Sequence, residues 1–454
     1  MLKILSKVSF FSNRIAIVIV IISCTDKFEV THELQMAELS RRKVCVVGAG
    51  AAGLCAARHF APNSNFELKV YEQTNDIGGT WVYKEATEVD ENGLPVHSSM
   101  YRDLRTNLPA KIMNFPDYQR LNAEEPCCVT HQEVRTYLQN YAKHFDLLKY
   151  IQFDTRVESV RLKKSIEGKE EWVVRVKMLK TKQEEEIVFN AAIICNGNGK
   201  FFGHRDAQPF IQKTRRSGRL GSGLPSSIIE VSGVERVEKE KIFFKDQSFV
   251  TADVFMFCTG YRYSFPFLDQ SCEIQVDNNF VTPLYKHLIN SNHPTMCIVG
   301  VPTVVVPFPM FHMQIQYFLA LLEKRISLPE RSIMLEDSKL KASKKRHAHK
   351  LMDKQWEYND SLADAGRFDR LPKFYKVGYE VWSSQRKMNL SSYKKARFVI
   401  SSDGESVELI IPSKSIDHVG VDARRVLYTT FVAPRSYTDY SEIINQWTTG
   451  ITLL

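Results

Sequence analysis

Short apolar runs that end in glycine are the most regular feature of the sequence. Residues 43–47 are rich in valine and are followed at once by glycines. Residues 51–60 then carry helix-forming residues, and residues 66–71 form a second strand-like run. A continuous apolar run is typical of a buried parallel strand, and strand, glycine turn, helix and strand in this order make a βαβ unit. The pattern therefore predicts an α/β fold built on a Rossmann-like parallel sheet.

A second arrangement occurs twice further along the chain. Charged residues separate two strand-like segments at 172–178 and 186–189, and again at 241–245 and 248–250. Each of these predicted hairpins is followed by an apolar strand that ends in glycine, at residues 191–197 and 252–260. This weak internal repeat predicts two domain endings of one type.

Two amphipathic helices and one further strand complete the expected core. Residues 131–145 and 310–322 place apolar side chains at helical spacing, and Pro309 is expected to start the second helix. Residues 295–301 form another apolar strand. Beyond about Ile411 the sequence predicts no element.

Residues 1–35 differ from the rest of the chain. Basic residues precede a short apolar run at 15–22, which is typical of a secretory signal or a weak membrane anchor. The run is shorter than the roughly 20 residues of a spanning helix. Met36 lies just before the first confident strand, so an artefactual leader is an equal alternative. The protein is secretory if the leader is a signal, and otherwise endoplasmic reticulum-associated or cytoplasmic.

Composition narrows the functional classes. The chain has 454 residues, 44% hydrophobic and 25% charged, which suits two or three globular domains. The net charge is +9, and we interpret the basic run at 344–350 as a solvated helix face because no aromatic residues interleave it. No nucleic-acid partner is therefore expected. Nine scattered cysteines contain no Cys-x-x-Cys pair, so neither a zinc site nor a redox dithiol is predicted.

The turn at residues 48–53 carries the clearest chemistry. Gly48 allows a tight turn, Gly50 lets the backbone approach a diphosphate, and Gly53 lets helix pack against strand. The amides at the helix start offer hydrogen bonds and a positive dipole end to phosphates. The predicted cofactor-binding residues here are Gly48, Ala49, Gly50, Ala51, Ala52 and Gly53.

Glu72 ends the second strand, where its carboxylate can accept hydrogen bonds from ribose hydroxyls. A carboxylate at this position repels a 2′-phosphate, which disfavours NADP at this site and leaves FAD and NAD open. Two further motifs follow, Gly-Gly-Thr-Trp at 78–81 and Leu-Arg-Thr-Asn-Leu at 104–108. Paired glycines permit a close backbone approach, and Trp81 can cover a flat ring system.

Taken together these motifs resemble the flavin-containing monooxygenases. The likeness covers about residues 42–200 and 228–405. It rests on the Gly48 turn, Glu72, residues 78–81 and 105–107, Phe-Cys-Thr-Gly-Tyr at 257–261, and the segments 306–312 and 355–360.

The resemblance implies FAD at the first site and NADPH at a second. It also implies oxygenation of an amine or sulfide by O₂ through a C4a-hydroperoxyflavin, with possible membrane association of the protein. Asn107 would be the catalytic residue beside flavin and nicotinamide. Gly79, Thr80, Trp81, Thr106 and Asn107 would join the cofactor-binding set, and no metal is implied. A Baeyer–Villiger oxygenase is the alternative enzyme.

The sequence departs from the family where a second dinucleotide turn should stand. Residues 201–204 keep part of an NADPH motif, but Ala207 replaces its later histidine. Residues 215–223 contain no apolar run and cannot form the missing buried strand. We therefore predict a truncated second dinucleotide-binding domain. Its origin is a frame or splicing error or a short isoform, and a flavin-binding protein without turnover is a further alternative.

These observations divide the chain into five segments. The assignments are a leader (1–35), the first part of the FAD-binding domain (36–200), a remnant of the NADPH-binding domain (201–260), the return of the FAD-binding domain with C-terminal helices (261–410), and an unassigned tail (411–454).

Overall fold

The computed structural model describes residues 41–85, 89–94, 96, 100–122, 126–197, 234–238, 241–251, 262–341, 345, 347–388 and 393–410. The described residues from Arg42 onward belong to one compact unit, and the elements below are part of it. The leader, the tail, the motif at 257–261 and the strand expected at 252–260 lie outside the described residues, as does the segment 198–233. The division of the chain into five segments therefore stays a prediction.

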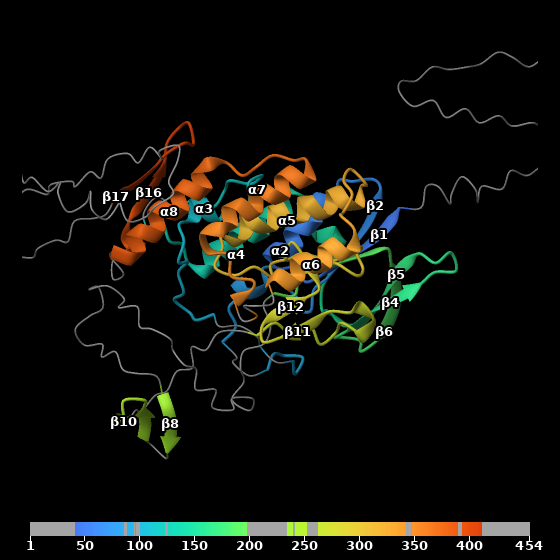
Figure 1. Cartoon of the computed structure of the whole chain (residues 1–454), viewed down its shortest axis with the longest axis horizontal. Coiled ribbons are helices and arrows are strands. Elements are labelled where there is room, and N and C mark those ends of the chain that lie inside the picture. The colour runs from blue at the N-terminus through green and yellow to red at the C-terminus, as the bar shows by residue number, and fades with distance from the viewer. Residues whose placement is uncertain are drawn as a thin grey trace, which may run out of the picture. The chain divides into compact units, whose positions relative to one another are not determined.

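The described strands include a seven-stranded sheet, of which β1 and β2 are labelled in Figure 1. The order is β13-β14-β15-β7-β1-β2-β3, and β1, β2, β3, β7 and β15 run parallel. The predicted parallel α/β sheet is thus confirmed. The strands span Arg42–Val47 (β1), Phe66–Tyr71 (β2), Ile151–Gln152 (β3), Ala191–Ile194 (β7), Leu284–Tyr285 (β13), Ile289–Asn290 (β14) and Met296–Ile298 (β15).

Helices pack on one side of this sheet around a continuous apolar core. Helix α2 (Ala51–Phe60) connects β1 to β2 and packs on α5 (Pro307–Leu322), where Phe60 lies against Phe318. Helix α5 begins at Pro307, two residues before the expected Pro309. Both prolines fit the first turn, because the amide that proline lacks has no intrahelical partner there.

The predicted helix at 131–145 is α4, His131–His144. Thr130 caps it, accepting from the Glu133 amide while the Glu133 side chain binds the Thr130 amide. The remaining helices are α3 (Ala110–Met113), α6 (Arg331–Lys341), α7 (Gln355–Gly366) and α8 (Lys373–Met388), with 3-10 helices at Gly79–Trp81 (η1), Leu148–Tyr150 (η2), Gln270–Cys272 (η3), Met352–Lys354 (η5) and Tyr393–Lys395 (η6).

The first predicted hairpin is part of an antiparallel three-stranded sheet, which shares a second apolar core with the central sheet. Its strands are β4 (Thr155–Lys164), β5 (Glu170–Met178) and β6 (Glu184–Phe189). Trp172 of β5 is buried and donates from Nε1 to Thr295 Oγ1 at 3.0 Å, just before β15. This bond joins the hairpin sheet to the central sheet.

The second predicted hairpin is confirmed in a small separate sheet, β8 (Val234–Glu238), β9 (Lys241–Phe244) and β10 (Phe249–Thr251). Two more antiparallel pairs were not predicted: β11 (Gln275–Asp277) with β12 (Phe280–Thr282), and β16 (Arg397–Ile400) with β17 (Val407–Ile410). The β16–β17 pair packs with α8, where Trp382 and Phe398 are buried together.

The structure describes residues 345 and 347–350 of the basic run; Lys345, His347 and Lys350 are exposed, in line with the charges, whereas His349 is buried. His349 lies in a turn, is 3% exposed, and accepts at Nε2 from the Val281 amide at 2.9 Å. Lys345 is exposed and pairs with Asp277. Buried contacts to β12, which charge patterning does not reveal, therefore fix this segment. In the described part of the chain no helix is both long and apolar enough to cross a membrane.

The seven cysteines that the structure describes are all buried and free of disulfides. Cys45 and Cys297 lie inside strands and Cys195 directly follows β7. Burial raises the pKa of each of these three thiols. They therefore act as small apolar residues of the core.

Candidate functional site

The three glycines of the turn after β1 are required for three different reasons. Gly48 has a φ of +100°, and a Cβ there would lie 2.7 Å from the Cys195 carbonyl oxygen. A Cβ on Gly53 would lie 1.8 Å from the Gly48 carbonyl oxygen, so this glycine lets α2 pack on the turn. A Cβ on Gly50 would meet nothing closer than the Gly79 Cα at 3.5 Å, an ordinary contact. Of these three glycines, only Gly50 lies where the protein leaves room for a side-chain methyl group.

The start of α2 offers free backbone donors beside Gly50. Gly50 is the N-cap residue, has extended backbone and supplies no side-chain cap. The first intrahelical bond runs from the Leu54 amide to the Gly50 carbonyl at 2.9 Å, so the amides of residues 51–53 precede the helical hydrogen bonds. Unused amides at a helix start, next to an unobstructed glycine, fit a diphosphate group.

Glu72 is held directly against this turn. It is 8% exposed and follows the last residue of β2. Its Oε2 accepts from the Ala49 amide at 2.8 Å, while Oε1 accepts from the amide and hydroxyl of Thr74 at 2.9 and 2.8 Å. An ionised carboxylate can accept about four hydrogen bonds, so about one position remains for a ribose hydroxyl. The carboxylate thus also organises the turn, which the motif alone did not predict.

The second glycine motif lies beside the first. The Gly78 amide donates to the Ala49 carbonyl at 3.1 Å, and Gly78 and Gly79 have φ values of +120° and +56°. Gly79 and Thr80 are exposed, and the half-buried Trp81 stands edge-on to Phe308 with ring centroids 6.4 Å apart. The two turns therefore form one surface.

The loop that carries Asn107 is fixed by buried polar contacts. Thr106 is 3% exposed, its amide donates to the Val129 carbonyl at 2.8 Å, and its hydroxyl donates to the Leu108 carbonyl at 2.8 Å. Asn107 is exposed, and its carbonyl accepts from Trp382 Nε1 at 2.8 Å. Thr106 therefore orders the loop from within, and Asn107 presents its side chain outward.

Helix α4 connects this loop to the glycine turns. The His131 amide, at the start of α4, donates to the Leu104 carbonyl at 3.0 Å. One turn later Arg135 forms an ion pair with Asp76, which precedes the second glycine motif. The structure thus brings Gly48, Gly50, Glu72 and Gly79 into one site and ties the Asn107 loop to it through α4. The binding roles assigned to these residues stay predictions.

One group of functional side chains was missed by the sequence analysis. Cys55 and His59 on α2 meet His312 on α5, and their ligand atoms lie within 4.8 Å of one another. The signal was the spacing of four residues between Cys55 and His59, which places both on one face of a helix. Burial lowers the pKa of His312 to about 4.

Comparison with known proteins gives the family. The family described as flavin-binding monooxygenase-like matches residues 41–215 and 212–366. Two curated relatives from Arabidopsis thaliana are flavin-containing monooxygenase FMO GS-OX-like 2, 31% identical with 78% of this chain and 91% of the relative covered, and FMO GS-OX-like 7, 32% identical with 74% and 87% covered. The solved structure of S-allyl-L-cysteine S-oxygenase from Allium sativum is 27% identical in sequence and has a TM-score of 0.69. The match covers 79% of this chain and 96% of that structure's chain. The chain therefore belongs to the flavin-binding monooxygenase-like family.

Proposed function

We propose that this chain binds FAD across the two glycine turns and, with NADPH and O₂, oxygenates a nucleophilic sulfur or nitrogen atom of a small molecule. The observation that carries the proposal is the unobstructed backbone at Gly50, beside the free amides of α2 and the carboxylate of Glu72. Family membership supports a flavin-dependent oxidoreductase as the enzyme class.

The residues of the site fit FAD in separate roles. The amides of residues 51–53 would hold the diphosphate, and Glu72 would accept a hydrogen bond from a ribose hydroxyl with the one position it has left. Bound FAD would supply the redox and oxygen-transfer chemistry. Asn107, exposed on an ordered loop, would orient the reacting groups, since its amide both donates and accepts.

Sulfur is the favoured atom within this proposal. The Allium structure is named as an S-oxygenase of S-allyl-L-cysteine, and it resembles this chain over most of both lengths. A thioether is a soft nucleophile that carries no proton to remove before oxygen transfer. We therefore propose a thioether as the first substrate class and a tertiary amine as the second.

One observation favours a second candidate, a flavin-binding protein with slow or no turnover. The family match comes in two parts that meet at residues 212–215, inside the segment where the sequence lacks a second dinucleotide turn. The split in the family match and the missing glycine turn together support the proposal that part of the NADPH-binding domain is missing. Hydride transfer needs the nicotinamide held against the flavin, so such a loss would slow reduction.

Anaerobic stopped-flow absorbance at the flavin band separates the two candidates. Two proteins are compared after mixing with NADPH. One has the present sequence, and the other, the restored chain, carries in addition an in-frame glycine turn recovered by sequencing the transcript. The first candidate predicts that the flavin of the present sequence bleaches rapidly, and that the protein consumes NADPH when a thioether is added in air. The second predicts yellow protein that bleaches only in the restored chain. If the protein with the present sequence purifies without flavin, both candidates are contradicted.

A further inference from the structure

We propose that Cys55, His59 and His312 form a binding site for a divalent transition-metal ion, with Zn²⁺ as the preferred ion. Cys55 and His59 are four residues apart on α2, so both side chains lie on one face of that helix. His312 comes from α5, which packs against that face. Two packed helices thus supply three ligands of the types that Zn²⁺ prefers.

The distances among the three side chains suit a single ion. His59 Nε2 and His312 Nδ1 are 3.1 Å apart, and the ligand atoms of all three residues lie within 4.8 Å of one another. Bonds of about 2.0–2.3 Å in a tetrahedral site place the ligand atoms roughly 3.3–3.8 Å apart. Side-chain adjustments of about an ångström would therefore complete the geometry without moving either helix.

Asp117 lies at the edge of the cluster beside His312 and supplies part of the charge balance, which leaves the fourth ligand position to water. Its Oδ1 lies 3.7 Å from His312 Nδ1, and its Oδ2 lies 3.2 Å from Arg58 Nε. A carboxylate and a thiolate together neutralise a divalent ion. Arg58 holds the far side of the carboxylate and stacks on Phe145 with 4.1 Å between guanidinium carbon and ring centroid.

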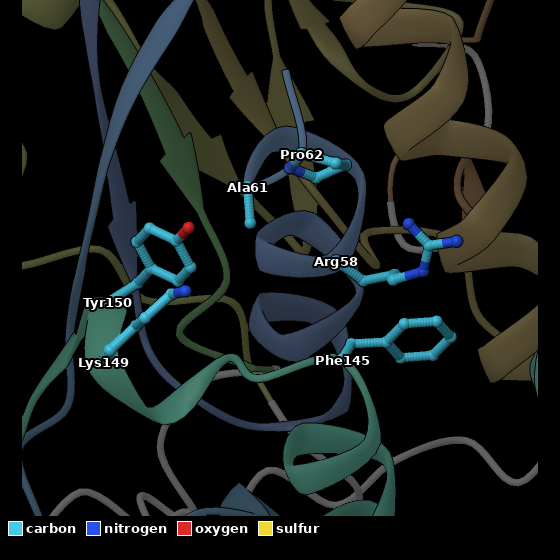
Figure 2. Close-up of a pocket in the computed structure, with 6 residues that line it drawn as sticks. All are labelled: Arg58, Ala61, Pro62, Phe145, Lys149 and Tyr150. Carbon is cyan, nitrogen blue, oxygen red and sulfur yellow. The ribbon is translucent and has the colours of Figure 1, made fainter. Parts of the chain in front are cut away.

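An open cavity lies beside Arg58, the residue that precedes His59 on α2. Arg58, Ala61, Pro62, Phe145, Lys149 and Tyr150 line a space of about 240 Å³ beside the C-terminal half of α2 (Figure 2). Figure 2 shows Arg58 extending from α2 beside the ring of Phe145. His59 directly follows Arg58 and is only partly buried, whereas Cys55 is fully buried. His59 is therefore the most accessible of the three proposed ligands.

Binding displaces the proton of the Cys55 thiol and one internal hydrogen bond. The Cys55 thiol loses its proton to solvent as the metal–sulfur bond forms, and the hydrogen bond between His59 and His312 is replaced by two metal–nitrogen bonds. The ion would tie α2 to α5 behind the glycine turn. Because metal that binds only the folded state stabilises it, the role is structural, and it does not depend on the proposed monooxygenase activity.

The test uses the full chain, freed of metal by a chelator and then titrated with Co²⁺ and Zn²⁺. Tetrahedral Co²⁺ with a thiolate ligand gives absorbance at wavelengths longer than the flavin absorbs, and Zn²⁺ should displace it in about a one-to-one ratio. Cys55→Ser, His59→Gln and His312→Gln should each weaken Zn²⁺ binding by on the order of 100-fold or more, since even outer partners of metal ligands contribute 10- to 100-fold.

His144→Gln is the matched control, because His144 is exposed on α4 and outside the cluster. It should bind both ions as the unchanged chain does. His59→Gln, the most accessible change, keeps the test decisive if Cys55→Ser fails to fold. Absence of the Co²⁺ band in the unchanged chain, or equal Zn²⁺ affinity in His59→Gln and the unchanged chain, would overturn the proposal.

Discussion

Replacing Gly50 by alanine separates flavin binding from folding. The new Cβ would lie 3.5 Å from the Gly79 Cα and 3.8 Å from its amide nitrogen, both ordinary contacts. The backbone at Gly50, with φ −72° and ψ −173°, is also open to alanine. Glycine is the better N-cap residue, so the free energy of unfolding should fall by only about 1 kcal/mol or less.

Flavin binding should change far more. A methyl group at this position stands between the α2 amides and the FAD diphosphate. Losing about two hydrogen bonds to a charged group, at about 1.5–3 kcal/mol each, weakens binding by about 3–6 kcal/mol. That corresponds to roughly a 10²- to 10⁴-fold rise in the FAD Kd. The purified variant should be colourless and folded.

The assay combines absorbance at the flavin band, FAD titration by fluorescence quenching, and urea unfolding of the flavin-free proteins. Gly404→Ala is the matched control, since Gly404 lies in an open turn with φ +70° and nothing within 4 Å of the new Cβ. It should lose about 1 kcal/mol of stability through backbone strain and keep its flavin. A yellow Gly50→Ala protein with unchanged FAD Kd would refute the placement of the diphosphate at this turn.

Three further changes test neighbouring parts of the site. Gly53→Ala should give little soluble protein, because its Cβ would lie 1.8 Å from the Gly48 carbonyl oxygen; a normal yield with native circular dichroism would contradict the structure. Glu72→Ala should weaken FAD by about 1–3 kcal/mol and also lower flavin-free stability, because a buried amide loses its acceptor; an unchanged Kd in a titration would remove Glu72 from the site. Trp382→Phe leaves the Asn107 carbonyl without its donor, so urea unfolding should show a loss of about 1–3 kcal/mol while flavin content stays normal; loss of flavin instead would place Trp382 at the cofactor.

The central sheet could be predicted because buried parallel strands leave continuous apolar runs. The predicted runs at 43–47 and 191–197 contain the paired strands β1 and β7, with Val44 opposite Ala191, although β7 ends at Ile194. The two-residue strands β13 and β14 carry no such pattern, since they are defined only by the neighbours they pair with. The burial of His349 was missed for the same reason: its partner amide is on Val281, far away in the sequence.

The candidate site was predictable where backbone geometry dictates residue type. Gly48 and Gly53 are required by a tight turn and by a close approach within the protein, and the spacing alone predicts both. The need for glycine at position 50 comes from the proposed cofactor and stays a prediction. The cluster of Cys55, His59 and His312 depends on how α2 packs against α5, and no local pattern encodes that contact. The segment that would show a second dinucleotide turn, 198–233, lies outside the described residues, so the predicted truncation stays a prediction.

The contact between the two glycine turns makes the residue tolerated at position 50 depend on the residue at position 79, and the reverse. A Cβ on Gly79 would lie 3.0 Å from the Gly50 Cα, and a Cβ on Gly50 would lie 3.5 Å from the Gly79 Cα. Each position has room for at most one new methyl group, and only while the other remains glycine. Substitutions at the two sites should therefore be strongly non-additive, with the double change costing more than the two single changes together. A lineage that loses one of these glycines becomes unable to vary the other.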